Sequence, residues 1–161
     1  MKRTVAAISA LLVLSGAPAI AHAEPDAPQP DTPCAGNLDA ALTQLPDLTT
    51  LVRCEAGAWR VFDDPYPRGD VWLTYGPEAT LHGEAQRNRE IDSGEWIGYP
   101  QDPGSRCVAE QVAIADTGSL GPPEASTGEP GQPLALHLKP LLFTVELGGH
   151  CLWQRGTLEL D

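Results

Sequence analysis

From residue 58 onward, short apolar or aromatic runs alternate with glycine, proline, asparagine and acidic residues along the chain. Residues 143–147 alternate strictly between apolar and polar side chains, which is the period of a strand with one buried face. Several such runs at regular spacing are typical of an antiparallel β-sandwich or barrel rather than of βαβ units. We therefore expect a mainly β domain with strands at 58–62, 71–75, 79–83, 95–98, 107–114, 134–138, 142–147 and 151–154.

Residues 37–45 show the longer period of a helix. Four apolar residues fall at positions i, i+3, i+4 and i+7 and so form one stripe: Leu38, Ala41, Leu42 and Leu45. Asn37 is a favourable N-cap, and Pro46 disfavours continuation of the helix. The pattern predicts one short N-terminal helix packed against the β domain.

Two further stretches carry no periodic pattern. Residues 24–33 contain four prolines and several acidic residues, which favours an extended tether. Residues 118–133 are rich in glycine and proline and are expected to form a long loop, and loops of this length are often functional or mobile. We expect the ordered unit to begin near Cys34, so that 34–161 is a single disulfide-linked β domain.

The first 23 residues have the features of a secretory signal peptide. Lys2 and Arg3 give a positive start, residues 5–14 are an apolar run, and a small-x-small cleavage site ends at Ala23. The apolar run is too short to span a bilayer as a helix. We therefore expect cleavage after Ala23 and a protein that is secreted or resides in the cell envelope, without stable membrane insertion.

Four cysteines follow this segment, and an exported chain meets an oxidising compartment in which disulfides form. Four cysteines allow three pairings. We favour Cys34–Cys54, which brackets the predicted helix, and Cys107–Cys151, which joins the starts of two predicted strands. A metal site is disfavoured because no Cys-x-x-Cys occurs and the histidines are scattered. The sequence therefore predicts two disulfides and neither a metal nor another cofactor.

The predicted mature chain is strongly acidic. All 22 acidic residues follow the signal segment, against eight of the ten basic residues, which leaves a net charge of −14. Such acidity disfavours nucleic acid and anionic membrane surfaces as partners, because both attract cationic side chains. It favours solubility outside the cell, and we expect a monomer. The basic run at 87–90 is interpreted as a solvated loop.

Two pairs of short motifs have a familiar spacing: SGEW at 93–96 before CVAE at 107–110, and FTVE at 143–146 before CLW at 151–153. Over about residues 54–155, the chain resembles small disulfide-linked all-β modules of secreted actinobacterial proteins, including a group of mycobacterial exported proteins. Abundant Ala, Gly and Pro also fit a GC-rich genome of that kind. The resemblance implies an exported β fold with the two cysteines of these motifs bonded, and it implies no activity, because none is assigned to that group.

No arrangement of residues in the sequence identifies a reaction. The pattern Gly-x-Ser-x-Gly is absent, although a Ser-His-Asp triad can be assembled from distant residues. Asp63, Asp64 and Asp70 flank a proline-rich turn and are interpreted as turn residues rather than calcium ligands. Arg68-Gly69-Asp70 spells a tripeptide that some adhesion receptors recognise, and we interpret it as an ordinary glycine turn.

Aromatic residues are the remaining candidates for a binding surface. The four tryptophans lie on predicted strands, where rings of this size usually belong to the core. Trp96 and Trp153 in particular are expected to be buried beside a disulfide. Tyr66, Trp72 and Tyr99 lie next to Pro/Gly loops and are the best candidates for exposed binding residues.

These observations favour a binding or interaction module without catalytic residues, whose partner is an unidentified protein or cell-envelope ligand. The alternatives are a hydrolase that acts on cell-wall glycan or peptide through carboxylates, and a purely structural envelope protein. An exposed aromatic groove favours binding, whereas two close carboxylates or a Ser–His pair in a cleft favour the hydrolase. A featureless polar surface favours the structural protein.

Overall fold

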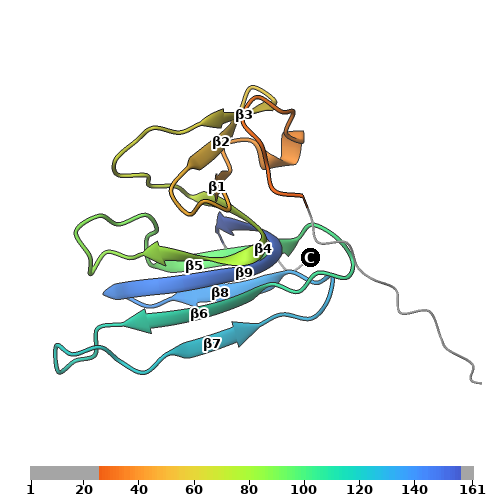
Figure 1. The fold of residues 1–161 in the computed structure, drawn as a ribbon. Helices are drawn as coiled ribbons and strands as arrows, with labels where there is room; N and C mark the ends of the chain where they lie inside the picture. Colours follow the sequence, from red (N-terminus) through yellow and green to blue (C-terminus); the bar gives the residue numbers. More distant parts are fainter. Residues whose placement is uncertain (1–25, 157–161) are drawn as a thin grey trace, which may run out of the picture.

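The computed structural model describes residues 26–156, in which nine strands form one mixed sheet (Figure 1). The predicted signal peptide at 1–23 and its cleavage site lie outside the described residues. In the described part, no helix is long and apolar enough to cross a membrane. The elements in chain order are η1 (Gly36–Leu38), β1 (Leu42–Gln44), β2 (Leu51–Glu55), β3 (Ala58–Val61), β4 (Val71–His82), β5 (Gly94–Pro100), β6 (Val108–Ala113), β7 (Glu124–Thr127), β8 (Leu134–Leu138) and β9 (Leu142–Arg155).

Strand β9 is the centre of the sheet because it pairs with three other strands. β4 runs antiparallel to most of β9, β5 pairs with the C-terminal half of β9, and β6 pairs with its N-terminal half. β8 extends the sheet beyond β5, and β7 extends it beyond β6. At Gly149, between the two halves, φ is +84°, and an added Cβ would lie 2.1 Å from the carbonyl oxygen of Arg106. This position therefore requires glycine.

The side chain of Gln111 links β6 to β8, although the two strands are not paired by their backbones. Its Nε2 donates to the carbonyl of His137 (3.0 Å), and its Oε1 accepts from the amide of Lys139 (2.9 Å). Gln111 is buried, so these two bonds satisfy an amide that would be costly to bury unpaired. The prediction of a mainly β, disulfide-linked fold is confirmed. The predicted antiparallel sandwich or barrel is not seen: the nine strands form one sheet, and this sheet is mixed because β1 pairs in parallel with β4.

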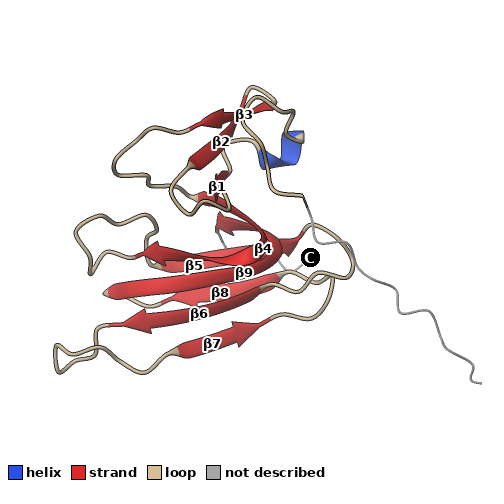
Figure 2. Ribbon diagram, viewed as in Figure 1, coloured by secondary structure: helices blue, strands red, loops and turns tan. Residues whose placement is uncertain are grey.

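The predicted N-terminal helix at 37–45 is wrong. Figure 2 shows a short 3-10 turn in that region, followed by β1. Ala40 has φ of +65°, outside the helical region, and its amide donates to the carbonyl of Cys54 (2.9 Å). Leu42 packs in one core and Ala41 in another, so the apolar residues lie on both faces of a strand. The backbone hydrogen bonds with β2 therefore stabilise a strand where the apolar period predicts a helix.

The strand predictions are confirmed in position but not always in extent. β8 and the prediction at 134–138 coincide. The predictions at 71–75 and 79–83 form one strand, β4, which is interrupted by a bulge between Gly76 and Ala79. Those at 142–147 and 151–154 likewise form the single strand β9. The predicted loop at 118–133 contains β7, which the sequence did not reveal because prolines and glycines surround it.

Buried apolar side chains form two cores, each with one disulfide. The larger core contains Trp72, Trp96 and Trp153, each at most 1 % exposed, together with Cys107–Cys151. The smaller core contains Trp59 and Cys54, which is bonded to Cys34. Both predicted disulfides are confirmed, as is the burial of the two tryptophans at 96 and 153. The surface position predicted for Trp72 is wrong, because this ring lies in the larger core.

Candidate functional site

Three arginines from distant parts of the chain gather around one aspartate, Asp92, in the loop before β5. Arg68 comes from the loop before β4, Arg89 from the loop after β4, and Arg155 from the end of β9. Arg68 Nε lies 3.1 Å from Asp92 Oδ2, and its Nη2 contacts the same oxygen. Arg155 Nη1 lies 3.4 Å from Oδ2, and Arg89 Nη1 lies 3.4 Å from Oδ1. We call Arg68, Arg89 and Arg155 the arginine cluster.

The carboxylate of Asp92 holds the three guanidinium groups of the arginine cluster in position. The residue is only 9 % exposed, and a carboxylate at this depth needs cationic partners to offset the loss of hydration. The hydrogen bond from Arg68 to Asp92 raises the pKa of Arg68. The buried Trp96 donates its indole N–H to the carbonyl of Asp92 (2.9 Å), which ties this loop to the larger core.

The outer sides of the three guanidinium groups face solvent. The side chains of Arg68, Arg89 and Arg155 are 51 %, 45 % and 45 % exposed. A guanidinium carries five N–H donors, so each group keeps donors beyond those directed at Asp92. Asp70 lies 3.5 Å from Arg155 and adds a second negative charge. The three guanidinium groups thus contact two carboxylates directly. Glu84, whose Oε2 accepts from the amide of Ser93 (3.3 Å), and Glu90, which follows Arg89, add further carboxylates nearby.

The tripeptide Arg68-Gly69-Asp70 belongs to this cluster and is not a freely projecting loop. The amide of Gly69 donates to the carbonyl of Glu90 (3.1 Å), and the indole of Trp72 donates to the carbonyl of Gly69 (3.1 Å). An added Cβ on Gly69 would lie 2.7 Å from the side chain of Leu42. Arg68 is bonded to Asp92, and Gly69 packs against Leu42, so this turn has contacts on each side and does not project into solvent.

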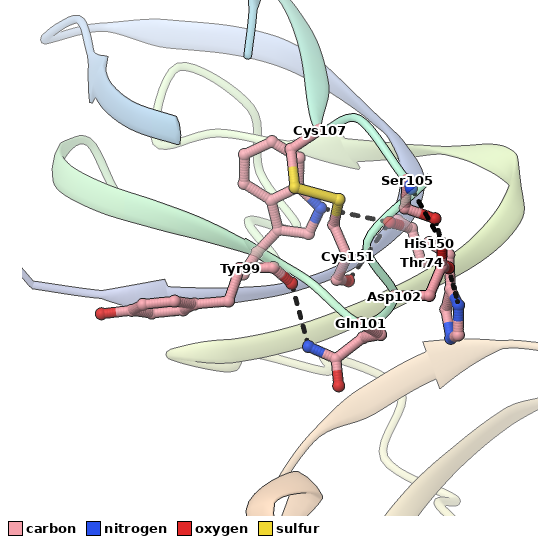
Figure 3. The surroundings of a disulfide bond; sticks show 9 residues. Thr74, Tyr99, Gln101, Asp102, Ser105, Cys107, His150 and Cys151 are labelled. Carbon is pink, nitrogen blue, oxygen red and sulfur yellow. Dashed lines mark hydrogen bonds and ion pairs between the residues drawn. A yellow bond between two sulfur atoms is a disulfide. The ribbon is translucent and has the colours of Figure 1, made fainter. Parts of the chain in front are cut away.

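A second polar group, which contains Ser105, Asp102 and His150, lies beside the Cys107–Cys151 disulfide (Figure 3). Asp102 stands between the other two. Ser105 Oγ donates to Asp102 Oδ2 (2.5 Å), and His150 Nδ1 lies 3.1 Å from the same oxygen. The hydrogen bond from Ser105, aided by that with His150, lowers the pKa of Asp102.

A hydrolytic triad requires the histidine between the serine and the aspartate, so that the imidazole accepts the hydroxyl proton. Here the serine hydroxyl is bonded to the carboxylate instead. The amides of Gly104 and Ser105 also donate to Asp102 Oδ1 (2.9 and 2.8 Å), which is the pattern of an aspartate that caps a turn. The group therefore stabilises the loop before Cys107 and gives no support to the hydrolase hypothesis.

The predicted binding residues Tyr66, Trp72 and Tyr99 do not form one surface. Tyr66 is 62 % exposed in the loop after β3, Tyr99 is partly buried against the smaller core, and Trp72 is buried. A groove of about 450 Å³ lies between residues 26–33 and the sheet, with Trp59 and Tyr75 in its floor. Because these two rings are only 4 % and 7 % exposed, the groove does not present aromatic faces for stacking.

Sequence reasoning missed the arginine cluster because its members are far apart in the chain. The one local signal is the basic run at 87–90, which contains Arg89 but has the pattern of a solvated loop. Of the predicted turn carboxylates, Asp70 pairs with Arg155. Within residues 26–156, no group of three His, Cys, Asp or Glu side chains is placed to hold a metal ion.

No model of a known protein family, no curated protein and no solved structure matches this chain. The resemblance to secreted actinobacterial modules therefore stays a prediction.

Proposed function

We propose that this protein is a monomeric binding module, exported through a signal peptide that is cleaved after Ala23, which binds an anionic group of its partner through the arginine cluster. The two disulfides fit an oxidising environment outside the cytoplasm. The observation that carries the proposal is the convergence of three half-exposed guanidinium groups on one buried carboxylate.

The chemistry of the cluster selects the class of ligand. Guanidinium groups bind carboxylate, phosphate and sulfate through paired N–H donors, and such charge-assisted bonds are stronger than neutral ones. Most of this acidic surface repels anions, whereas the exposed N–H donors of the arginine cluster offer them paired, charge-assisted hydrogen bonds at one place. Asp92 and Asp70 hold the guanidinium groups in position before a ligand arrives, which lowers the entropic cost of binding. The partner is thus an anionic ligand of the envelope or the extracellular space.

The proposal is tested by titrating the protein with sodium sulfate and with inorganic phosphate, followed by amide NMR shifts at constant ionic strength. We expect saturable shifts in residues 68–70 and 89–94. Arg89→Gln should weaken binding about tenfold, which corresponds to about 1.4 kcal/mol. Arg89 is the best choice because its contact with Asp92 is a single one at 3.4 Å, so its loss disturbs the fold least.

Two control variants sharpen the test. Arg155→Lys keeps the charge but removes the planar donor pair, and it should weaken binding if paired donors matter. Arg106→Gln removes an exposed positive charge outside the cluster and should leave the affinity unchanged. Equal losses in Arg89→Gln and Arg106→Gln would indicate general charge attraction and would refute a site at the cluster. Absence of saturable shifts in the natural sequence would favour a structural protein.

A further inference from the structure

The groove between residues 26–33 and the sheet has a wall that is formed by the chain's own proline-rich segment. Its volume of about 450 Å³ lies in the range typical of ligand sites. Figure 1 shows residues 26–33 leading from beside the sheet up to β3. The lining residues outside this segment are mainly apolar or aromatic: Leu38, Trp59, Leu73, Tyr75 and His150. A proline-rich stretch is thus already seated against an aromatic surface, and three features of this contact point to a function.

The first feature is the indole N–H of Trp59, which has no hydrogen-bond acceptor within residues 26–156. The indoles of the other three tryptophans each donate to an acceptor in the protein, at 3.1, 2.9 and 3.2 Å. A largely buried indole without an acceptor is unusual. In the described part, only Thr43 Oγ1 and Asp92 Oδ1 are both unpaired and closed to solvent. The N–H of Trp59 therefore keeps accessible surface, and since Trp59 lines the groove, an acceptor can approach it from there.

The second feature is the weak attachment of the first five described residues. The amide of Asp31 donates to the carbonyl of Trp59 (2.7 Å), and the amide of Trp59 donates to the carbonyl of Thr32 (2.8 Å). Residues 26–30 make no hydrogen bond to any described residue beyond position 32, because Gln29 accepts only from Thr32 in the same turn. We call residues 26–30 the strap. It is held in the groove by side-chain contacts and can turn away about this hinge without breaking the pairing at Trp59.

The third feature is the composition of the strap. Pro28 and Pro30 favour the polyproline II conformation, in which the backbone has no internal hydrogen bonds and its carbonyls remain free to accept. Grooves that recognise such segments are lined by aromatic residues. Here Trp59 and Tyr75 supply the rings, and the Trp59 indole supplies a donor for a carbonyl. The groove therefore has the chemistry of a site for proline-rich polypeptide.

We propose that the strap occupies a groove that binds a proline-rich, extended segment of a partner protein, and that this segment displaces the strap. A carbonyl of the partner accepts from the Trp59 indole, and its proline rings pack on Tyr75 and Leu73. With the strap in place, Trp59 and Tyr75 are only 4 % and 7 % exposed, so wide contact with their rings requires its departure. The strap is covalently tethered, so it competes at high effective concentration and weakens binding of the partner. This site does not rest on the arginine cluster.

The probe is N-acetyl-octaproline amide, titrated into the whole protein and followed by the NMR shift of the Trp59 indole N–H. A peptide of alternating alanine and glycine of the same length is the matched comparison and should give no saturable shift. The double variant Pro28→Gly with Pro30→Gly loosens the strap, because it removes both rings and their conformational preference. It should bind octaproline at least fivefold more tightly than the natural protein. Pro122→Gly with Pro123→Gly makes the same change at exposed positions elsewhere and should leave the affinity unchanged.

Trp59→Phe keeps an aromatic ring and removes the donor, so it should weaken binding of octaproline at least fivefold in the loosened protein. In the free natural protein, the Trp59 indole proton should exchange with solvent faster than the other three. An equally slow exchange would overturn the role of this donor without any variant. Equal affinity of the natural and loosened proteins would overturn the role of the strap. Absence of a saturable shift in both proteins, or equal binding of the alanine–glycine peptide, would overturn the site, and Arg89→Gln should change none of these results.

Discussion

The two disulfides lie in regions that differ in how much core surrounds them. Cys107–Cys151 belongs to a core of fourteen buried residues with three tryptophans, whereas Cys34–Cys54 belongs to one of six buried residues with a single tryptophan. The larger region therefore has many contacts that stabilise it besides its disulfide. In the smaller region, η1 and the three short strands β1–β3 pack against Leu73 of β4 and Leu152 of β9. With so few buried residues, this region depends more heavily on its covalent link.

The largest effect is expected from the larger core. Trp153 is fully buried, its indole donates to Thr74 Oγ1 (3.2 Å), and its ring fills the space above Gly98. Trp153→Ala should lower the free energy of unfolding by about 3–5 kcal/mol, as other large-to-small core changes do. Chemical denaturation followed by circular dichroism measures this loss.

Tyr66→Ala is the control for this prediction, since Tyr66 is 62 % exposed. Its loss should cost less than about 0.5 kcal/mol. A Trp153→Ala protein as stable as the Tyr66→Ala protein would contradict the placement of the larger core.

Removing either disulfide should lower the free energy of unfolding, and the two removals should lower it by different amounts. The loops that they close span 44 residues for Cys107–Cys151 and 20 residues for Cys34–Cys54. On chain entropy alone, replacing each pair with Ala should cost about 4 and about 3 kcal/mol, respectively. Denaturant midpoints of the two double variants check the order.

Amide hydrogen exchange can show whether the two regions unfold separately. Loss of Cys34–Cys54 should accelerate exchange in β1–β3 and leave β9 protected, because the smaller core has few other contacts. Uniform acceleration across the whole chain would show instead that the two regions unfold as one unit.

The smallest effect is expected from Asp47 in the smaller region. Its hydrogen bonds, of which those with Thr50 are the strongest, lower its pKa from 3.8 to about 2. The stabilisation by this carboxylate is therefore complete above about pH 4 and is lost as the pH falls toward 2. Asp47→Asn should make the loss of stability between pH 4 and 2 shallower, as measured by thermal unfolding at several pH values. Asp63→Asn is the exposed control. An identical change in both variants would refute the role of the Asp47 carboxylate in the loss of stability at low pH.

The same two regions differ in how far the sequence predicts them. The larger region was predicted well because its strands are long enough to show their periods, as in β8. β1 has three residues, too few to show a period. Its first residue, Leu42, and the preceding Ala41 face different cores, so their spacing matches that of a helical stripe. The arginine cluster has only the basic run at 87–90 as a local signal, because Arg155 reaches Asp92 only through the pairing of β9 with β5.

The central position of β9 also constrains the order in which the chain can assemble. β4, β5 and β6 all pair with β9, yet β9 is the last of the described strands to be synthesised. Cys54 emerges soon after Cys34, whereas Cys107 must wait 44 residues for Cys151. During that interval its thiol is free to react with the wrong cysteine. Contacts of such long sequence separation also slow folding. Where the Cys34–Cys54 bond closes before Cys107 appears, no other free cysteine is left with which Cys107 can mispair before Cys151 follows.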